Sequence, residues 1–292
     1  MLQNLCRALA FGSALFAATA SFAEDRPDQI VIRYAPVTEP QLQPIAEYVK
    51  KAHALEKAQI LLKPLRLPRP LKIEMRGCQG EINSWYEDDV VTICYEFLDD
   101  IWKHAPRETT PAGVAPIDAV VGPYVDVVFH EVGHAIFDYL AIPLFGREED
   151  AADEISVYLT LKFPKADAHR LILGNAYQYR SDLVGHKLPL SLEKFANEHE
   201  LGAQRFFNVL CLAYGYDPKL FGDVLKKGYL PAERADDCED EYKQLNYAFD
   251  KLIRPHIDQQ LAKQIYEAAW LPPMTMRPPR RPGRHSKPAS AK

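Results

Sequence analysis

Two histidines and a glutamate stand together in the segment H-E-V-G-H at residues 130–134. On a helix, residues four apart lie one above the other, so His130 and His134 can offer two imidazole nitrogens to one metal ion. Glu131 would then lie beside the ion as a general base for a bound water. The flanking apolar residues recur at near-helical spacing, and a proline and a glycine follow. The segment therefore predicts a helix that carries a metal site.

A hydrolytic zinc site needs three protein ligands and an open position for water, so two histidines are not sufficient. One scheme places a glycine three residues and a third histidine six residues after His134, but Phe137 and Leu140 stand there. A second scheme takes an aspartate from a G-T-x-D segment. It fits weakly, because Gly146 is followed by Arg and Glu.

The third scheme takes a glutamate from the next helix, with an aspartate one turn later that hydrogen-bonds a ligand histidine. Glu149 and Asp153 fit this scheme, because they stack on one face of the helix expected over residues 148–163. The other carboxylates of the segment are alternatives for the ligand, in the order Asp150, Glu148, Glu154. Carboxylates also favour a first helical turn without any metal, through the helix dipole.

If the metal-bound water attacks an amide, the site also needs a donor for the oxyanion that forms. His199 is the first choice, because it lies in a polar stretch of the helix expected over residues 192–214, close to carboxylates. A solvated surface histidine is the alternative interpretation. The other candidates are Arg205, Tyr177, Tyr179 and Tyr158.

The N-terminus has the features of a secretory signal peptide: Arg7 precedes an apolar run over residues 8–20, and small residues allow cleavage after Ala23. An uncleaved membrane anchor is the alternative, but the run is short for a spanning helix and no second candidate follows. We therefore expect a signal peptide over residues 1–23 and a secreted or periplasmic protein. We expect no integral membrane segment after cleavage.

Four cysteines remain after that cleavage, in a chain expected to reach an oxidising compartment. Cys78 and Cys94 lie in neighbouring strand-like segments, which favours pairing them and leaves Cys211 for Cys238. Sequence alone permits three pairings. A zinc site built from these thiols is disfavoured, because no C-x-x-C spacing occurs.

Length and composition are those of a globular protein of one domain or two small ones. The chain is 47% hydrophobic, which allows a substantial core, and its net charge of −5 argues against a nucleic acid partner. We assign residues 24–270 to one domain. Pro, Arg, Lys and Ser dominate residues 271–292, which we predict to be a disordered basic tail.

Helices dominate the expected fold, so its class is α+β and mostly helical. Helices are expected over residues 41–62, 98–104, 148–163, 167–179, 192–214, 221–225, 231–253 and 257–270, besides the one with the H-E-V-G-H segment. Strand-like segments cover residues 30–34, 71–78 and 90–97. We expect the last two to form a small antiparallel region packed on the H-E-V-G-H helix. This region could hold an extended substrate at its edge or merely cover the helix.

The chain resembles a family of exported bacterial proteins that are described as metallopeptidases of the gluzincin type. The resemblance covers most of the mature chain. It rests on H-E-V-G-H, on G-R-E-E-D-A-A-D at 146–153, on the strand segment over 83–96, and on the cysteine-bearing segments over 198–211 and 230–238. The resemblance implies a zincin-like fold with zinc ligands His130, His134 and Glu149 and a catalytic Glu131.

These observations together predict a zinc-dependent peptidase that acts on peptide or protein substrates. One alternative is an inactive protein of the same fold that serves in binding or in maintenance of the cell envelope, although the intact Glu131 counts against it. Another is a zinc hydrolase of a non-peptide amide, such as a cell-wall linkage. No sequence feature favours or excludes the latter.

Overall fold

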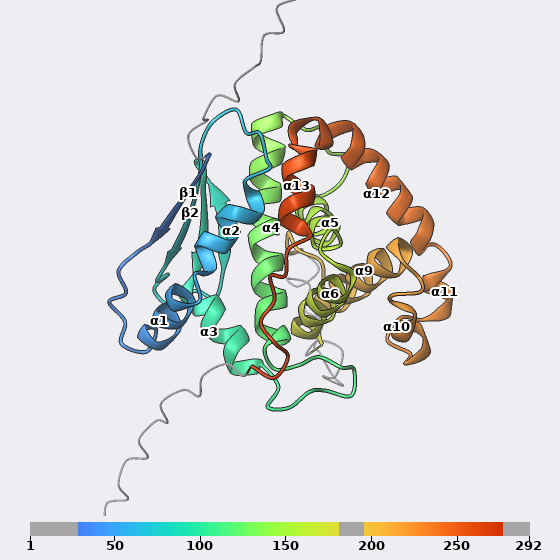
Figure 1. Cartoon of the computed structure of the whole chain (residues 1–292), viewed down its shortest axis with the longest axis horizontal. Coiled ribbons are helices and arrows are strands. Elements are labelled where there is room, and N and C mark those ends of the chain that lie inside the picture. Colours follow the sequence, from blue (N-terminus) through green and yellow to red (C-terminus); the bar gives the residue numbers. More distant parts are fainter. Residues whose placement is uncertain (1–28, 181–195, 277–292) are drawn as a thin grey trace, which may run out of the picture.

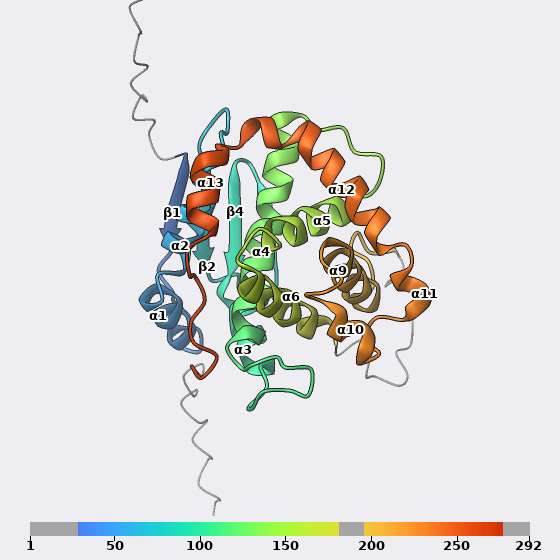
Figure 2. The ribbon, with the colours of Figure 1, turned by 45° about the vertical axis from the view of Figure 1, so that its right-hand side comes forward.

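The structure is a computed structural model that describes residues 29–180 and 196–276. It places a small sheet on one side and most of the helices on the other (Figure 1). The helix α4 (Asp118–Leu140) lies between them, as the view turned by 45° also shows (Figure 2). The expected α+β class with a majority of helix is confirmed.

The sheet has four strands in the order β1-β2-β4-β3. Their bounds are β1 (Ile30–Tyr34), β2 (Leu71–Arg76), β3 (Ser84–Glu87) and β4 (Val90–Cys94). Alternate residues of β2 and β4 are fully buried against the helices, with the two-residue period of a half-covered sheet. The described helices of the same half are α1 (Gln43–Lys51), α2 (Ala54–Leu62) and α3 (Tyr95–His104).

The predicted antiparallel pairing of residues 71–78 with 90–97 is wrong, because β2 and β4 are neighbours but run parallel. The antiparallel partner of β4 is β3, which lies outside the strand-like segments predicted from the pattern of residues but within the segment over 83–96 on which the resemblance rests. Asp88 and Asp89 both have positive φ, 49° and 64°, and form a two-residue hairpin turn between β3 and β4. The packing of this region on α4 is as expected.

The helix predicted over residues 41–62 is two helices, α1 and α2. His53 between them has a left-handed backbone with φ 52°, which ends the first helix and redirects the chain. In consequence α1 packs against α3 while α2 packs across β1.

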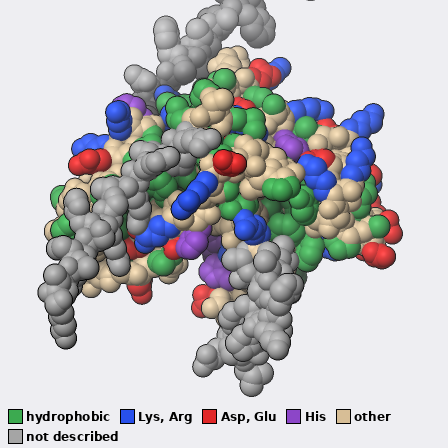
Figure 3. Space-filling view, turned by 90° about the horizontal axis from the view of Figure 1, so that it is seen from below, with side chains coloured by type: hydrophobic (Ala, Val, Ile, Leu, Met, Phe, Trp, Pro, Cys, Tyr) green, Lys and Arg blue, Asp and Glu red, His purple; other side chains and the backbone are tan. Residues whose placement is uncertain are grey.

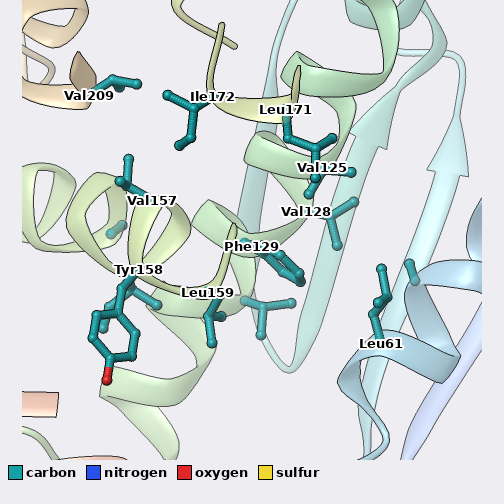
Figure 4. Packing of buried hydrophobic residues seen from close by; sticks show 14 of the residues in the cluster. Leu61, Val125, Val128, Phe129, Val157, Tyr158, Leu159, Leu171, Ile172 and Val209 are labelled. Atoms are coloured by element: carbon teal, nitrogen blue, oxygen red, sulfur yellow. The ribbon is translucent and has the colours of Figure 1, made fainter. Parts of the chain in front are cut away.

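Most of the remaining helices lie on the side of α4 away from the sheet, whereas α13 (Gln259–Tyr266) packs on α2 (Figure 1). The bounds of the others are α5 (Glu148–Thr160), α6 (Lys165–Tyr179), α9 (Gly202–Tyr216), α10 (Gly222–Lys226), α11 (Ala232–Ala235), α12 (Cys238–Leu252) and the 3-10 helix η1 (Arg254–His256). Figure 4 shows side chains of α4, α5, α6 and α9 meeting in the core, among them Phe129, Val157, Ile172 and Val209.

Both predicted disulfides are confirmed. Cys78 and Cys94 join the chain just after β2 to the end of β4, and Cys211 and Cys238 join α9 to the start of α12. Among the described residues, no helix is long and apolar enough to cross a membrane. The expected signal peptide over 1–23 lies outside the described residues, and so does the expected tail beyond residue 276.

On the face shown in Figure 3, basic and acidic side chains are intermingled, with hydrophobic side chains between them. This pattern agrees with the small net charge of −5 for a chain with 35 basic and 40 acidic residues. No broad basic field of the kind that binds a nucleic acid backbone is visible on this face.

Candidate metal centre

The helix α4 presents His130 and His134 on one face, at the spacing of one turn. α4 is apolar on most of its circumference, because it is enclosed by the sheet on one side and by α5 and α6 on the other. α5 approaches closely, since an added Cβ at Gly133 would lie only 3.4 Å from Cα of Ala152. This close approach brings the first turn of α5 to the two histidines.

Three atoms that could ligate a metal converge at this contact. Nε2 of His130 lies 3.0 Å from Oε2 of Glu149 and 3.2 Å from Nε2 of His134. Nε2 of His134 lies 3.5 Å from the same Glu149 oxygen. A tetrahedral zinc ion with bonds of about 2.0–2.1 Å holds its ligand atoms about 3.3 Å apart. The spacing of the three atoms therefore fits such an ion without rearrangement of the helices.

Asp153 lies one turn beyond Glu149 and contacts the other nitrogen of the same histidine. Its Oδ1 accepts from Nδ1 of His130 at 2.8 Å, which fixes the ring and leaves Nε2 free to bind a metal. Arg205 of α9 in turn grips Asp153 with two hydrogen bonds, of 2.7 and 2.6 Å. The guanidinium of Arg205 also lies 4.8 Å from the centre of the Tyr179 ring.

The neighbouring carboxylates take other roles. Oε1 of Glu148 accepts from Nδ1 of His134 at 2.8 Å, so each histidine has its own carboxylate behind it. Asp150 is paired with Arg147 at 2.9 Å. Among the described residues, only Glu149 completes a group of possible ligands with the two histidines, and Glu154 takes no part in it.

The charges of the site suit a cation. Burial alone would lower the pKa of His130, but hydrogen bonds with Asp153 and Glu149 outweigh burial and raise it to about 10. Burial opposes ionisation of Glu149 and Asp153, yet the contacts with histidines hold the pKa of Glu149 far below its ordinary value. His130 and Arg205 together lower the pKa of Asp153 to about 2. The protein thus stabilises positive charge where a metal ion would lie.

Glu131 is buried, with 5% of its surface exposed, and is not a solvated surface glutamate. Burial raises the pKa of its carboxyl group, and the nearby His130 and His134 offset part of that rise. Among the described residues it has no hydrogen-bond partner. It lines a cleft of about 590 Å³, which the two histidines and Glu149 also line. Because the Glu131 carboxylate lines the cleft and has no described partner, it is available to a water or a substrate there.

His199 lies in the cleft, but in an irregular segment before α9 and not on a helix as predicted. The correction follows from the start of α9 at Gly202; residues 181–195 of the predicted helix lie outside the described ranges. Nε2 of His199 is 2.8 Å from Oε2 of Glu149, and its ring stacks on that of His130 at 5.8 Å.

The other four predicted oxyanion donors do not line the cleft. Arg205 and Tyr179 lie behind Asp153. The hydroxyl of Tyr158 donates to Asn246 at 2.8 Å, and the ring of Tyr177 is covered by Arg180.

The sequence interpretation assigned no residues to the opposite wall of the cleft, although its resemblance included the strand segment over 83–96. Asn83, Ser84, Trp85 and Tyr86, from β3 and the residue before it, form this wall. The adjacent aromatic residues of this short segment are typical of strands and were the available signal. The contact of Glu148 with His134 was also missed, because Glu148 had been considered only as a ligand.

Comparison with known proteins gives one match. No curated protein and no solved structure matches the chain. The family described as "Putative metallopeptidase" matches residues 34–253, a range that includes α4, α5, β3 and the whole group around Glu149. The metal-binding character of that description agrees with the convergence of His130, His134 and Glu149. The chain therefore belongs to this metallopeptidase family.

Proposed function

We propose that the protein is a zinc-dependent peptidase, with His130, His134 and Glu149 as zinc ligands and Glu131 as general base. The observation that carries the proposal is the convergence of three ligand atoms at the wall of a cleft, beside a buried carboxylate that has no hydrogen-bond partner among the described residues. The inactive alternative is less well supported, because a protein that only binds a partner has no need of such a carboxylate.

The reaction assigned to the site is hydrolysis of a peptide bond by water. Zinc, when bound, lowers the pKa of water enough to make it a nucleophile near neutral pH. Glu131 accepts the proton from the attacking water and passes it to the leaving amine, so the carboxylate is regenerated in each turnover. The raised pKa of Glu131 makes it a stronger base than an ordinary glutamate.

We assign His199 to the oxyanion of the tetrahedral intermediate. Its side chain is 40% exposed and lines the cleft, so it can turn toward a substrate carbonyl from its contact with Glu149. Asp153 and Arg205 keep the ring of His130 in place, a role that needs no contact with substrate.

We further propose that the substrate binds as an extended peptide along β3. This strand is at the edge of the sheet and pairs only with β4 among the described strands. Its residues Ser84, Trp85 and Tyr86 line the cleft. An edge strand offers backbone hydrogen bonds to a peptide of any sequence, which suits a protein substrate. The signal-like N-terminus and the two disulfides support action outside the cytoplasm.

Metal removal tests this function. The purified protein is incubated with a diverse peptide library before chelation, after chelation, and after zinc is restored, and products are identified by mass spectrometry. We expect cleavage to disappear with the metal and to return with one equivalent of zinc. Cleavage that persists when metal analysis finds no bound ion would contradict the proposal.

A further inference from the structure

A second cavity lies along α4 and shares no lining residue with the cleft that Glu131 and Glu149 line. Its volume is about 630 Å³, within the range of about 300–1,000 Å³ that holds drug-sized ligands. The walls come from α1, α2, α3, α4 and the residues that follow α13. Val125 and Val128 of α4 and Leu61 of α2 contribute apolar side chains to its lining, and Figure 4 shows where these residues lie on their helices.

One wall of this cavity is the C-terminal segment Trp270 to Pro272, which is fixed in place. Arg170 of α6 donates to the carbonyl of Pro272 at 2.8 Å and is itself held by Asp118 at 2.6 Å. The indole of Trp270 donates to the carbonyl of Ile265 at 2.7 Å. In Figure 1 this segment descends along α4. The wall lies beyond residue 253, where the family match ends.

The lining also carries polar groups that have no partner in the described part of the chain. Neither the hydroxyl of Tyr48 nor the indole nitrogen of Trp102 has a hydrogen-bond acceptor there, although their rings contact each other at 5.0 Å. Lys51 and Lys57 are exposed lining residues, and no described carboxylate pairs with either. Of the described residues that line the cavity, only Glu47 is acidic.

We propose that this cavity binds a single long-chain carboxylate, a free fatty acid. The hydrocarbon chain would occupy the apolar interior, and the carboxylate would remain at the lysine-bearing rim formed by Lys51 and Lys57. The chain's own last residues are not suitable occupants. Residues 277–292 contain no Val, Leu, Ile, Met, Phe, Tyr or Trp, so they carry nothing to fill an apolar cavity.

The test is displacement of a dansyl-labelled undecanoic acid from the purified protein by octanoic, dodecanoic and hexadecanoic acid. We expect saturable binding of one probe per chain. Affinity should rise with chain length by up to about fourfold for each methylene that the cavity buries. Dodecanol, which has the chain without the charge, should bind at least about tenfold more weakly than dodecanoic acid.

Two variants separate the two parts of the site. Lys51→Glu/Lys57→Glu should weaken binding of the acid about tenfold or more while leaving dodecanol unaffected. The matched control is Lys50→Glu. Lys50 is on α1 beside Lys51 but does not line the cavity, so this variant should bind the acid as the wild type does. Val121→Trp should abolish binding of both compounds by filling the space, and its melting temperature shows that it is folded.

Four results would overturn the proposal. Three of them are the absence of saturable binding by any of the acids, equal affinity for dodecanol and dodecanoic acid, and binding that folded Val121→Trp retains. Association with phosphatidylglycerol vesicles without binding of the free acid would also overturn it, because the surface would then recognise a membrane.

Discussion

Glu149 is the residue at which three imidazole rings meet. His130, His134 and His199 all reach its Oε2 within 3.5 Å, although they come from one helix and one irregular segment. These contacts hold the pKa of the Glu149 carboxyl far below its ordinary value, so the group is ionised at neutral pH. Removal of this carboxylate should affect metal affinity more than removal of any neighbouring one.

A pair of substitutions tests this expectation. Glu149→Ala should reduce zinc affinity by at least about a hundredfold, because it removes one of three ligands. Asp150→Ala is the matched control, since Asp150 lies on the same turn but pairs with Arg147, and its affinity should stay within a few-fold of the wild type. Competition with a chromophoric zinc chelator measures both. If Asp150→Ala lost zinc and Glu149→Ala retained it, the assignment of the ligand would be wrong.

The grouping of His130, His134, Glu149 and Asp153 could be predicted because helical spacing fixes which residues share a face. The two helices are consecutive and packed together, so only one short loop had to be inferred. The two hydrogen bonds from Arg205 to Asp153 could not be predicted. They depend on where α9 packs against α5, which no local pattern in the sequence encodes.

At the scale of elements, the position of α4 is set by its crossing with α6. Gly122 and Gly174 face each other there, and the backbones approach so closely that an added Cβ at Gly122 would lie 2.5 Å from the nitrogen of Asn175. An added Cβ at Gly174 would meet the carbonyl oxygen of Asp118. The two glycines therefore allow the close packing that positions α4.

Gly174→Ala should destabilise the protein by about 1–3 kcal/mol or more, because backbone atoms cannot move aside as a side chain can. Gly222→Ala serves as the control, since an added Cβ there meets nothing within 4 Å and the residue is at the start of α10. Urea unfolding of both variants and the wild type gives the comparison. Equal stability of the two variants would show that the crossing tolerates a methyl group.

Element boundaries show where sequence reasoning reached its limit. Proline and glycine residues predicted many of the helix ends. No residue type at or near His53 predicts the left-handed backbone that separates α1 from α2. The division follows from tertiary packing, because α1 and α2 bury their apolar faces against different partners. The pattern of residues did not predict β3 for a related reason: the strand has only four residues, and its pairing depends on the turn at Asp88 and Asp89.

At the scale of the whole molecule, Lys162 joins three helices through aromatic rings. Its Nζ lies 3.7 Å from the ring centre of Tyr158 of α5 and at longer range from Tyr216 of α9 and Tyr242 of α12. Burial and the nearby Arg254 both lower the pKa of Lys162, against the attraction of Asp250, and together bring it to about 8. The positive charge of Lys162 therefore lowers the free energy of unfolding of the protein.

The pH dependence follows from this depressed pKa. Well below pH 8 Lys162 is charged in the folded protein, and this destabilisation is fully present. Between about pH 8 and 10.5 the folded chain has lost a proton that the unfolded chain keeps, so wild-type stability gains with rising pH. Relative to Lys162→Met, the wild type should gain about 1.5 kcal/mol between pH 8 and 9.5, because the slope rises from about half of 1.4 kcal/mol per pH unit at pH 8 toward the whole of it above pH 9. Chemical unfolding at both pH values measures this gain.

Lys162→Arg is the control for that experiment, because arginine keeps its charge throughout the range. The stability difference between Lys162→Arg and Lys162→Met should not change with pH. A wild-type curve that runs parallel to that of Lys162→Met would contradict the depressed pKa.

The central claim is that Glu131 acts as the base for hydrolysis at a metal held by His130, His134 and Glu149. The most direct measurement is kcat/KM for a peptide that the zinc-loaded protein cleaves, compared between the wild type and Glu131→Gln at equal zinc content. The substitution keeps the size of the side chain and removes the base, so kcat/KM should fall by at least about a hundredfold with zinc still bound. Equal rates in the two proteins would contradict the account.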